Sequence, residues 1–155
     1  MKDKFNKSIG NSNFGPRLQV SKNITINDLQ FVEYFGVTDL QLNNCQNAYI
    51  LRAPVNLRRL SISNTPLKTI KGIERLTQLQ YLVLKNCQIF NIDRLLALDN
   101  LEVLDVSYNK IDREYNRIIR QLENNGCQII CENYQINYEQ IQNITQNEIN
   151  ESDLW

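Results

Sequence analysis

The chain has 155 residues, and 42% of them are hydrophobic, which is enough for one continuous core but not for two large ones. Lysine and arginine together balance aspartate and glutamate, so the formal net charge at pH 7 is zero. Dedicated nucleic-acid binders normally carry a basic face, so this balance argues against a nucleic-acid partner.

The first segment carries Lys2, Lys4, Lys7 and Arg17 against Asp3. We predict a flexible basic arm over residues 1–17, either a solvated flank or an interaction arm. No apolar run approaches the roughly 18 residues of a membrane span, and the chain does not start with the apolar stretch of a signal peptide. We therefore expect a cytoplasmic or nuclear protein that has no membrane partner and keeps its cysteines reduced.

The next segment places apolar residues at every third position, at Ile26, Leu29 and Val32, and Gly36 can end a helical turn. We predict that residues 24–36 form an N-terminal cap. This cap belongs to a predicted domain that spans residues 18–131.

The middle of the chain repeats itself every 22 residues. Copies with the pattern L-x-x-L-x-[LIV] start at Leu57, Leu79 and Leu101, and a shorter, degenerate copy starts at Val37. The alternation of apolar residues in each copy predicts a strand with one inward face. A spacing of three in the second half of two copies predicts a short helix or 3₁₀ segment, at Ile70, Ile73 and Leu76, and at Ile92, Leu95 and Leu98. One such unit cannot bury its apolar edge alone, so the copies must stack.

From Val37 to Ile111 the chain resembles a leucine-rich repeat array, and the 22-residue spacing resembles the class typified by the nuclear regulatory subunit of protein phosphatase 1. The resemblance implies an α/β fold, a right-handed solenoid with a parallel sheet on its concave side. Short helices or 3₁₀ turns would form the convex side. Enzymes with such repeats generally carry catalysis in a separate domain, for which this chain has no room.

The sequence pattern of residues 112–131 predicts a C-terminal cap. It consists of a helix that stops at Asn125-Gly126 and a last strand from Cys127 to Cys131. A helix followed by a strand resembles the cap of the phosphatase-regulator class. Residues 132–155 form an acidic tail, and part of it is either a short amphipathic helix or a disordered polar segment. Its acidic residues are Glu132, Glu139, Glu148, Glu151 and Asp153.

The four cysteines do not form a recognisable metal site, because the chain contains no histidine and zinc needs four converging ligands. Cys45, Thr65, Cys87 and Asn109 share one place of the repeat, where the resemblance implies an Asn that satisfies backbone groups of the turn. We therefore expect a structural role for Cys45 and Cys87, and core packing for Cys127 and Cys131. Nucleotide-binding and nucleophile motifs do not occur, so we predict no enzyme, no cofactor, no metal and no small-molecule substrate.

The variable positions between the framework leucines point away from the core, so a partner would meet them. Tyr81, Val83 and Val103 form a small apolar patch whose polar flanks have the make-up of an interface rim. The alternatives are that the acidic tail folds back over this patch, or that the patch has no role. The predicted partner-binding residues are Arg59, Tyr81, Val83, Lys85, Glu102, Val103, Asp105 and Tyr108.

These features predict a non-enzymatic protein–protein interaction module, an adaptor or regulatory subunit that binds another protein on its concave face. The alternative is a structural subunit of a large cytoskeletal or ribonucleoprotein assembly. In that case the basic head and the acidic tail would be docking arms.

Overall fold

The computed structural model describes residues 6–21, 36–45, 48, 50, 53–67, 69–111 and 113–132. These ranges form a single seven-stranded sheet and a few short helices. In chain order the elements are β1 (Asn6–Ser12), β2 (Gly15–Ser21), β3 (Asp39–Asn43), β4 (Arg59–Ser63), η3 (Ile73–Arg75), β5 (Tyr81–Lys85), η4 (Asp93–Ala97), β6 (Val103–Asp105), η5 (Arg113–Tyr115), α1 (Asn116–Asn124) and β7 (Gln128–Ile130).

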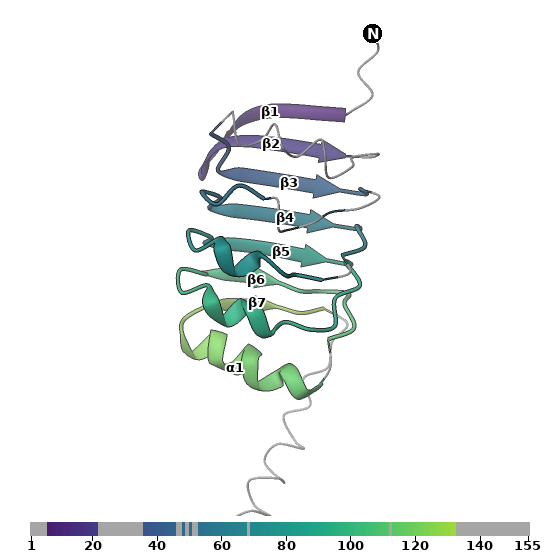
Figure 1. The fold of residues 1–155 in the computed structure, drawn as a ribbon, viewed down its shortest axis with the longest axis vertical. Helices are drawn as coiled ribbons and strands as arrows, with labels where there is room; N and C mark the ends of the chain where they lie inside the picture. The colour runs from purple at the N-terminus through teal and green to yellow at the C-terminus, as the bar shows by residue number, and fades with distance from the viewer. Residues whose placement is uncertain are drawn as a thin grey trace, which may run out of the picture.

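The strands follow one another across the sheet in the same order as in the sequence (Figure 1). β1 pairs with β2 in antiparallel orientation, and every later pair is parallel. Parallel neighbours need a crossover on one side of the sheet, and here the β4–β5 and β5–β6 crossovers contain the 3₁₀ helices η3 and η4. The result is an α/β arrangement of a sheet layer and a layer of short helices.

The repeat register predicted from sequence is present in β4, β5 and β6. Leu60, Leu82 and Leu104 are direct neighbours across these strands and are buried. Each fully buried leucine contributes on the order of 1.5 to 3 kcal/mol, so the ladder is a principal source of stability. The residues predicted to cover the other side are also buried, namely Ile70, Ile73, Leu76, Ile92, Leu95 and Leu98.

The N-terminal arm was predicted wrongly, because residues 6–12 and 15–21 are strands of a hairpin and not a flexible flank. Leu18 and Val20 of β2 lie in register with Leu40 and Leu42 of β3, so they continue the buried ladder by one strand. A stack of repeats exposes apolar surface at its end, and the hairpin covers this surface. The predicted cap at 24–36 lies outside the described residues except for Gly36.

The C-terminal end contains the predicted helix and strand as α1 and β7. Ile118, Ile119 and Leu122 are the buried residues of α1, and β7 pairs with β6. Gly126 has φ 91°, a left-handed conformation that glycine tolerates at a helix end. The acidic tail beyond Glu132 lies outside the described residues. Within the described ranges, no helix has the length and apolar character needed to cross a membrane.

Candidate functional site

The buried side chain of Asn109 forms hydrogen bonds with three segments: the end of β5, the turn that follows β5 and its own turn after β6. Its Oδ1 accepts hydrogen bonds from the backbone N–H groups of Cys87 and Ile89, at 2.9 and 3.1 Å. Its Nδ2 donates to the carbonyls of Leu84, Val106 and Ser107. Buried backbone groups are costly when unpaired, so this side chain holds one copy of the repeat against the next.

Cys87 and Thr65 occupy the same place in earlier copies of the repeat. Their side chains also form hydrogen bonds with backbone groups of the turns, but each forms fewer of them than Asn109 does. The thiol of Cys87 donates to the carbonyls of Ile62 and Lys85, at 3.2 and 3.3 Å. The hydroxyl of Thr65 accepts from the backbone N–H of Cys45 at 3.1 Å and donates to a carbonyl in its own turn. Burial raises the pKa of the Cys87 thiol to about 12, so it stays a neutral, unreactive hydrogen-bonding group at physiological pH.

Cys127 and Cys131 also have raised pKa values, both about 11, chiefly because burial disfavours their thiolates. Cys127 is buried, and Cys131 is half-buried against the core. In the part of the chain that the structure describes, no three Cys, Asp or Glu residues converge in a way that could hold a metal ion. These thiols therefore act as packing groups.

The predicted partner-binding residues lie on the side of the sheet turned away from the leucine ladder, which we call the outer face. Arg59, Tyr81 and Val103 are neighbours across β4, β5 and β6, and Val83 pairs with Asp105 two residues further along. Tyr81, Val83 and Val103 are half-buried, whereas Glu102 is exposed. The patch inferred from the repeat register is therefore contiguous.

An additional aromatic residue, Phe14, lies on this patch. It sits in the turn between β1 and β2, and its ring centroid is 4.8 Å from that of Tyr81, with the ring planes tilted by 56°. The guanidinium carbon of Arg59 is 5.9 Å from the centre of the same ring. Aromatic pairs at this separation and cation–π contacts are both favourable, so the N-terminal hairpin adds an aromatic side chain to the outer face.

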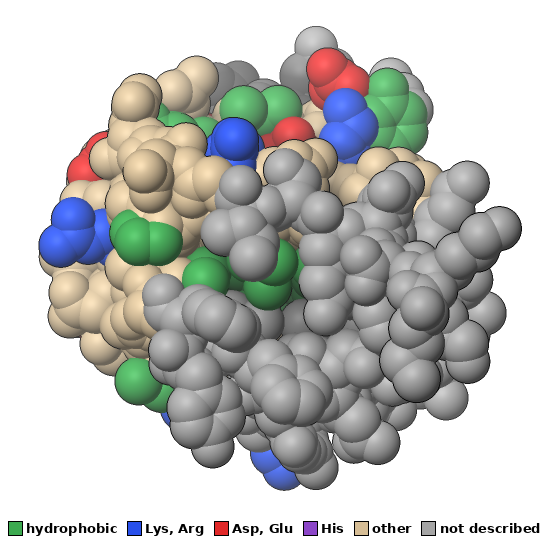
Figure 2. Space-filling view, turned by 90° about the horizontal axis from the view of Figure 1, so that it is seen from above, with side chains coloured by type: hydrophobic (Ala, Val, Ile, Leu, Met, Phe, Trp, Pro, Cys, Tyr) green, Lys and Arg blue, Asp and Glu red, His purple; other side chains and the backbone are tan. Residues whose placement is uncertain are grey.

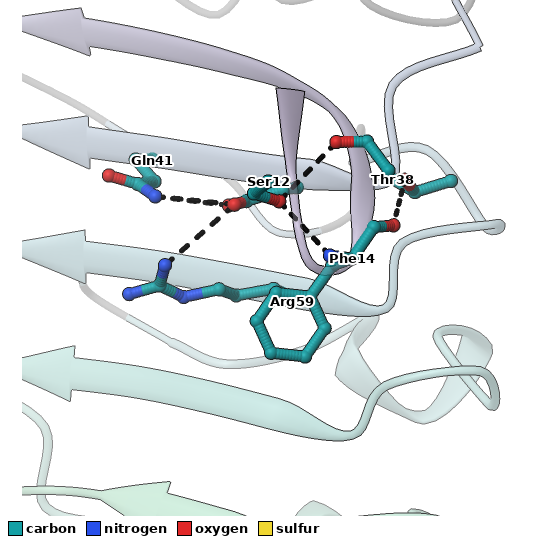
Figure 3. A network of polar contacts seen from close by, with 7 residues as sticks. Ser12, Phe14, Thr38, Gln41 and Arg59 are labelled. Carbon is teal, nitrogen blue, oxygen red and sulfur yellow. Dashed lines mark hydrogen bonds and ion pairs between the residues drawn. The ribbon is translucent and has the colours of Figure 1, made fainter. Parts of the chain in front are cut away.

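Polar contacts of the Ser12 and Thr38 side chains with backbone groups hold the hairpin turn in place (Figure 3). The Thr38 hydroxyl donates to the carbonyl of Phe14, and the Thr38 N–H donates to the carbonyl of Pro16 at 3.0 Å. The Ser12 hydroxyl accepts from the N–H of Phe14 at 3.2 Å. Gly15 has φ 104°, and a Cβ there would lie 2.5 Å from the Thr38 hydroxyl oxygen, so only glycine fits this turn.

Asp39 lies fully buried beneath Arg59 at the start of β3. Its carboxylate is 3.7 Å from Arg59 Nη1 and accepts a hydrogen bond from Gln41 Nε2 at 3.2 Å (Figure 3). A buried carboxylate needs such partners, because transfer of an unpaired charge out of water is expensive. Arg59 therefore has two contacts at once, with Asp39 and with Phe14.

At the other end of β5, Lys85, Tyr108 and Glu132 form a second cluster. Lys85 Nζ lies 5.1 Å from the centre of the Tyr108 ring and 3.9 Å from a carboxylate oxygen of Glu132. A hydrogen bond to Glu132, together with the charge of that carboxylate, raises the pKa of the Tyr108 phenol. Tyr108 is 44% exposed, so a partner can reach it.

Tyr108 occupies a backbone position that asparagine fills in the earlier copies. Asn44, Asn64, Asn86 and Tyr108 all have positive φ, at 53°, 51°, 53° and 60°. Asparagine adopts this left-handed conformation more readily than a bulky residue does. The tyrosine is therefore held in a strained conformation at the edge of the outer face.

The structure thus places four of the eight predicted residues in two groups on the outer face. Arg59 and Tyr81 meet around Phe14, and Lys85 meets Tyr108 around Glu132. Sequence reasoning missed Phe14, because nothing in the local pattern relates it to a strand far along the chain. Seen along the stack from its N-terminal end, basic, acidic and hydrophobic side chains lie close together along the upper rim of the molecule (Figure 2).

A groove of about 480 Å³ lies away from this face, beside η4. Buried Ile70 and Ile89 line it together with Phe90, which is 60% exposed, and the ion pair between Arg94 and Glu74 at 2.7 Å lies beside it. The groove contains none of the predicted partner-binding residues.

Comparison with known proteins identifies part of this architecture. The family model named Leucine Rich Repeat matches residues 100–125, the part of the chain that contains β6 and α1. No curated protein matches the chain. Leucine-rich repeats generally mediate protein–protein interaction and are typically not enzymes. Residues 100–125 of this chain are therefore similar to a leucine-rich repeat.

Proposed function

We propose that the chain is a non-enzymatic adaptor or regulatory subunit that binds another protein through its outer face. The observation that supports this proposal most directly is the cluster of Phe14, Tyr81 and Arg59, with the ring centroids 4.8 Å apart. Aromatic residues and arginine are enriched among the residues that dominate interface energies, and half-exposed rings held in fixed positions lose little entropy on binding.

The charged residues around the cluster give the proposed site a polar rim. Glu102 and Tyr108 are exposed, and Lys85 forms its ion pair with the exposed carboxylate of Glu132 at 3.9 Å. Such rim pairs contribute little stability to the free protein, so a partner can replace them at small cost.

The rest of the proposal concerns the class of the repeat and the cellular compartment of the protein. We propose that the copies from Val37, Leu57 and Leu79 belong to the same array as residues 100–125. On this proposal they wind as a right-handed solenoid of the 22-residue class. We place the protein in the cytoplasm or nucleus, because all four cysteines are free thiols and a reducing compartment keeps them so. We propose neither a membrane nor a nucleic acid as partner.

The test is affinity capture from native lysate with the Tyr81→Asp/Val103→Asp double variant beside the wild type. The matched control is Phe90→Asp, which places the same charge at an exposed hydrophobic position away from the outer face. The proposal requires a protein that the wild type and the control capture and the double variant loses. Equal capture by all three folded proteins contradicts it.

A further inference from the structure

The charges of the outer face are not evenly satisfied within the chain. Arg59 is paired with Asp39, and Lys85 is paired with Glu132. Arg58 and Glu102 are both exposed, and neither forms an ion pair with any residue that the structure describes. Among the residues that the structure describes, one cation, Arg58, and two anions, Glu102 and Asp105, therefore lack an ion-pair partner beside the apolar patch.

Arg58 and Glu102 lie at equal distances on either side of β5. The N–H of Gln80 donates to the carbonyl of Arg58 at 2.8 Å, and the N–H of Glu102 donates to the carbonyl of Gln80 at 2.8 Å. Arg58, Gln80 and Glu102 thus form one row across the sheet, with neighbours about 4.8 Å apart. β5 stands in the middle of this row, and its outer face carries Tyr81 and Val83.

A surface with a cation on one side of a central apolar strand and an anion on the other is complementary to itself. In a two-fold symmetric pair every contact occurs twice, because the same surface is used by both subunits. A two-fold axis parallel to the strands and directly above β5 would place β4 of one molecule opposite β6 of the other. Arg58 would then face Glu102 of the second copy, and Glu102 would face its Arg58.

The other residues of the outer face fit the same axis. Tyr81 and Val83 would meet their own counterparts, and Ser61 on β4 could donate a hydrogen bond to Asp105 on β6 of the second copy. The Phe14 ring, which lies over Arg59, would meet Val103 of the second copy. Apolar residues at the centre and charges at the edge are the usual anatomy of an interface, and two packed sheets keep their strands roughly aligned.

We infer that the outer face binds a second copy of this chain as a two-fold symmetric dimer, with Tyr81 and Val83 at its centre and two Arg58–Glu102 contacts at its edge. The inference rests on the proposal that this face is an interaction surface, and it names one partner for it. Because the edge contacts are exposed, the dimer weakens as salt rises.

The test is sedimentation velocity of the purified chain over a range of concentrations, with Arg58→Glu, Glu102→Arg and the double variant that carries both. Each single change turns two attractions into two repulsions, so we expect the dissociation constant to rise about tenfold or more. The double variant exchanges the two charges and should dimerise like the wild type. Arg117→Glu, an exposed reversal on α1, is the control and should have no effect.

A mixture of the two single variants excludes misfolding as the cause. Arg58→Glu and Glu102→Arg molecules have opposite charges at both edge contacts, so an equal mixture should form a heterodimer although each variant alone is weakened. The inference is wrong if the wild type stays monomeric at several hundred micromolar, or if neither the double variant nor the mixture recovers dimerisation. A monomeric wild type that still captures another protein through Tyr81 and Val103 would overturn only the dimer. A dimer without any captured protein would overturn only the adaptor proposal.

Discussion

Replacement of Asn109 by alanine tests how the copies of the repeat are held together. The change removes the acceptor of two buried backbone donors, the N–H groups of Cys87 and Ile89. It also removes the donor to three carbonyls, those of Leu84, Val106 and Ser107. An unsatisfied buried donor costs roughly 1–3 kcal/mol, so two of them predict a loss of about 3 kcal/mol in the free energy of unfolding.

This loss is large beside the roughly 5–15 kcal/mol that stabilises a typical domain. It should appear as a lower urea midpoint in circular dichroism, with an unchanged dependence of free energy on urea concentration. Asn109→Thr is the informative comparison, because Thr65 at the same place already accepts from one N–H and donates to one carbonyl. We expect threonine to retain about half of the stabilisation.

Asn109→Asp separates the acceptor from the donor. The carboxylate keeps an oxygen for the two N–H groups, but it turns a charge towards the three carbonyl oxygens that the amide now satisfies. Asn109→Asp should therefore destabilise the chain more at pH 7 than at pH 4. A loss below about 1 kcal/mol for Asn109→Ala would refute the reasoning, because it would mean that the turns do not depend on this side chain.

Three further predictions concern stability. Tyr108→Asn should raise the urea midpoint by about 0.3 M, because asparagine adopts the left-handed conformation at φ 60° with less strain than tyrosine, and Asn86 already has this conformation in the preceding copy. A lower midpoint would mean that the contacts of Tyr108 stabilise the protein by more than the strain costs. Leu82→Ala should cost roughly 2–5 kcal/mol in a urea titration, because Leu82 is fully buried at the centre of the ladder, and Ser61→Ala on the outer face should cost far less. The pKa of Cys87 rises from 9.0 in the unfolded chain to about 12 in the folded one, so stability from its neutral thiol is complete below pH 9 and is lost as pH rises towards 12. The urea midpoint of the wild type should therefore fall more steeply between pH 8.5 and 10.5, roughly the lower half of that window, than the midpoint of Cys87→Ala; equal slopes would contradict this.

Much of the framework could be predicted because its signals are local. Alternation at Leu82 and Leu84 specifies a strand with one buried face, and the 22-residue period puts the next strand in register without any knowledge of the rest of the chain. The place shared by Cys87 and Asn109 follows from the same register. The structure agrees with the structural role predicted for both residues, since both are buried and hydrogen-bonded to turn backbone groups.

The candidate site could be predicted only in part. The repeat register correctly put Tyr81, Val83 and Val103 side by side, because positions that alternate with buried leucines must face outwards. The repeat register also gives Asp39 an outward position, where a side chain is normally exposed, whereas Asp39 is fully buried beneath Arg59. Asp39 lies in register with Arg17 of β2, in a hairpin that the charge pattern of residues 1–17 had suggested was flexible.

The sequence by itself determined the repeat, the inward leucines and the order of the strands within the repeated copies, because each of these depends on residues within one or two copies of the pattern. Only the tertiary structure decided what lies on the outer face. β2 pairs with β3 because Leu18 and Val20 cover the apolar end of the stack, and this pairing carries Phe14 onto Tyr81 from a distant part of the chain. A contact of that kind leaves no local period in the sequence, since it depends on burial at the end of the stack and not on the repeat.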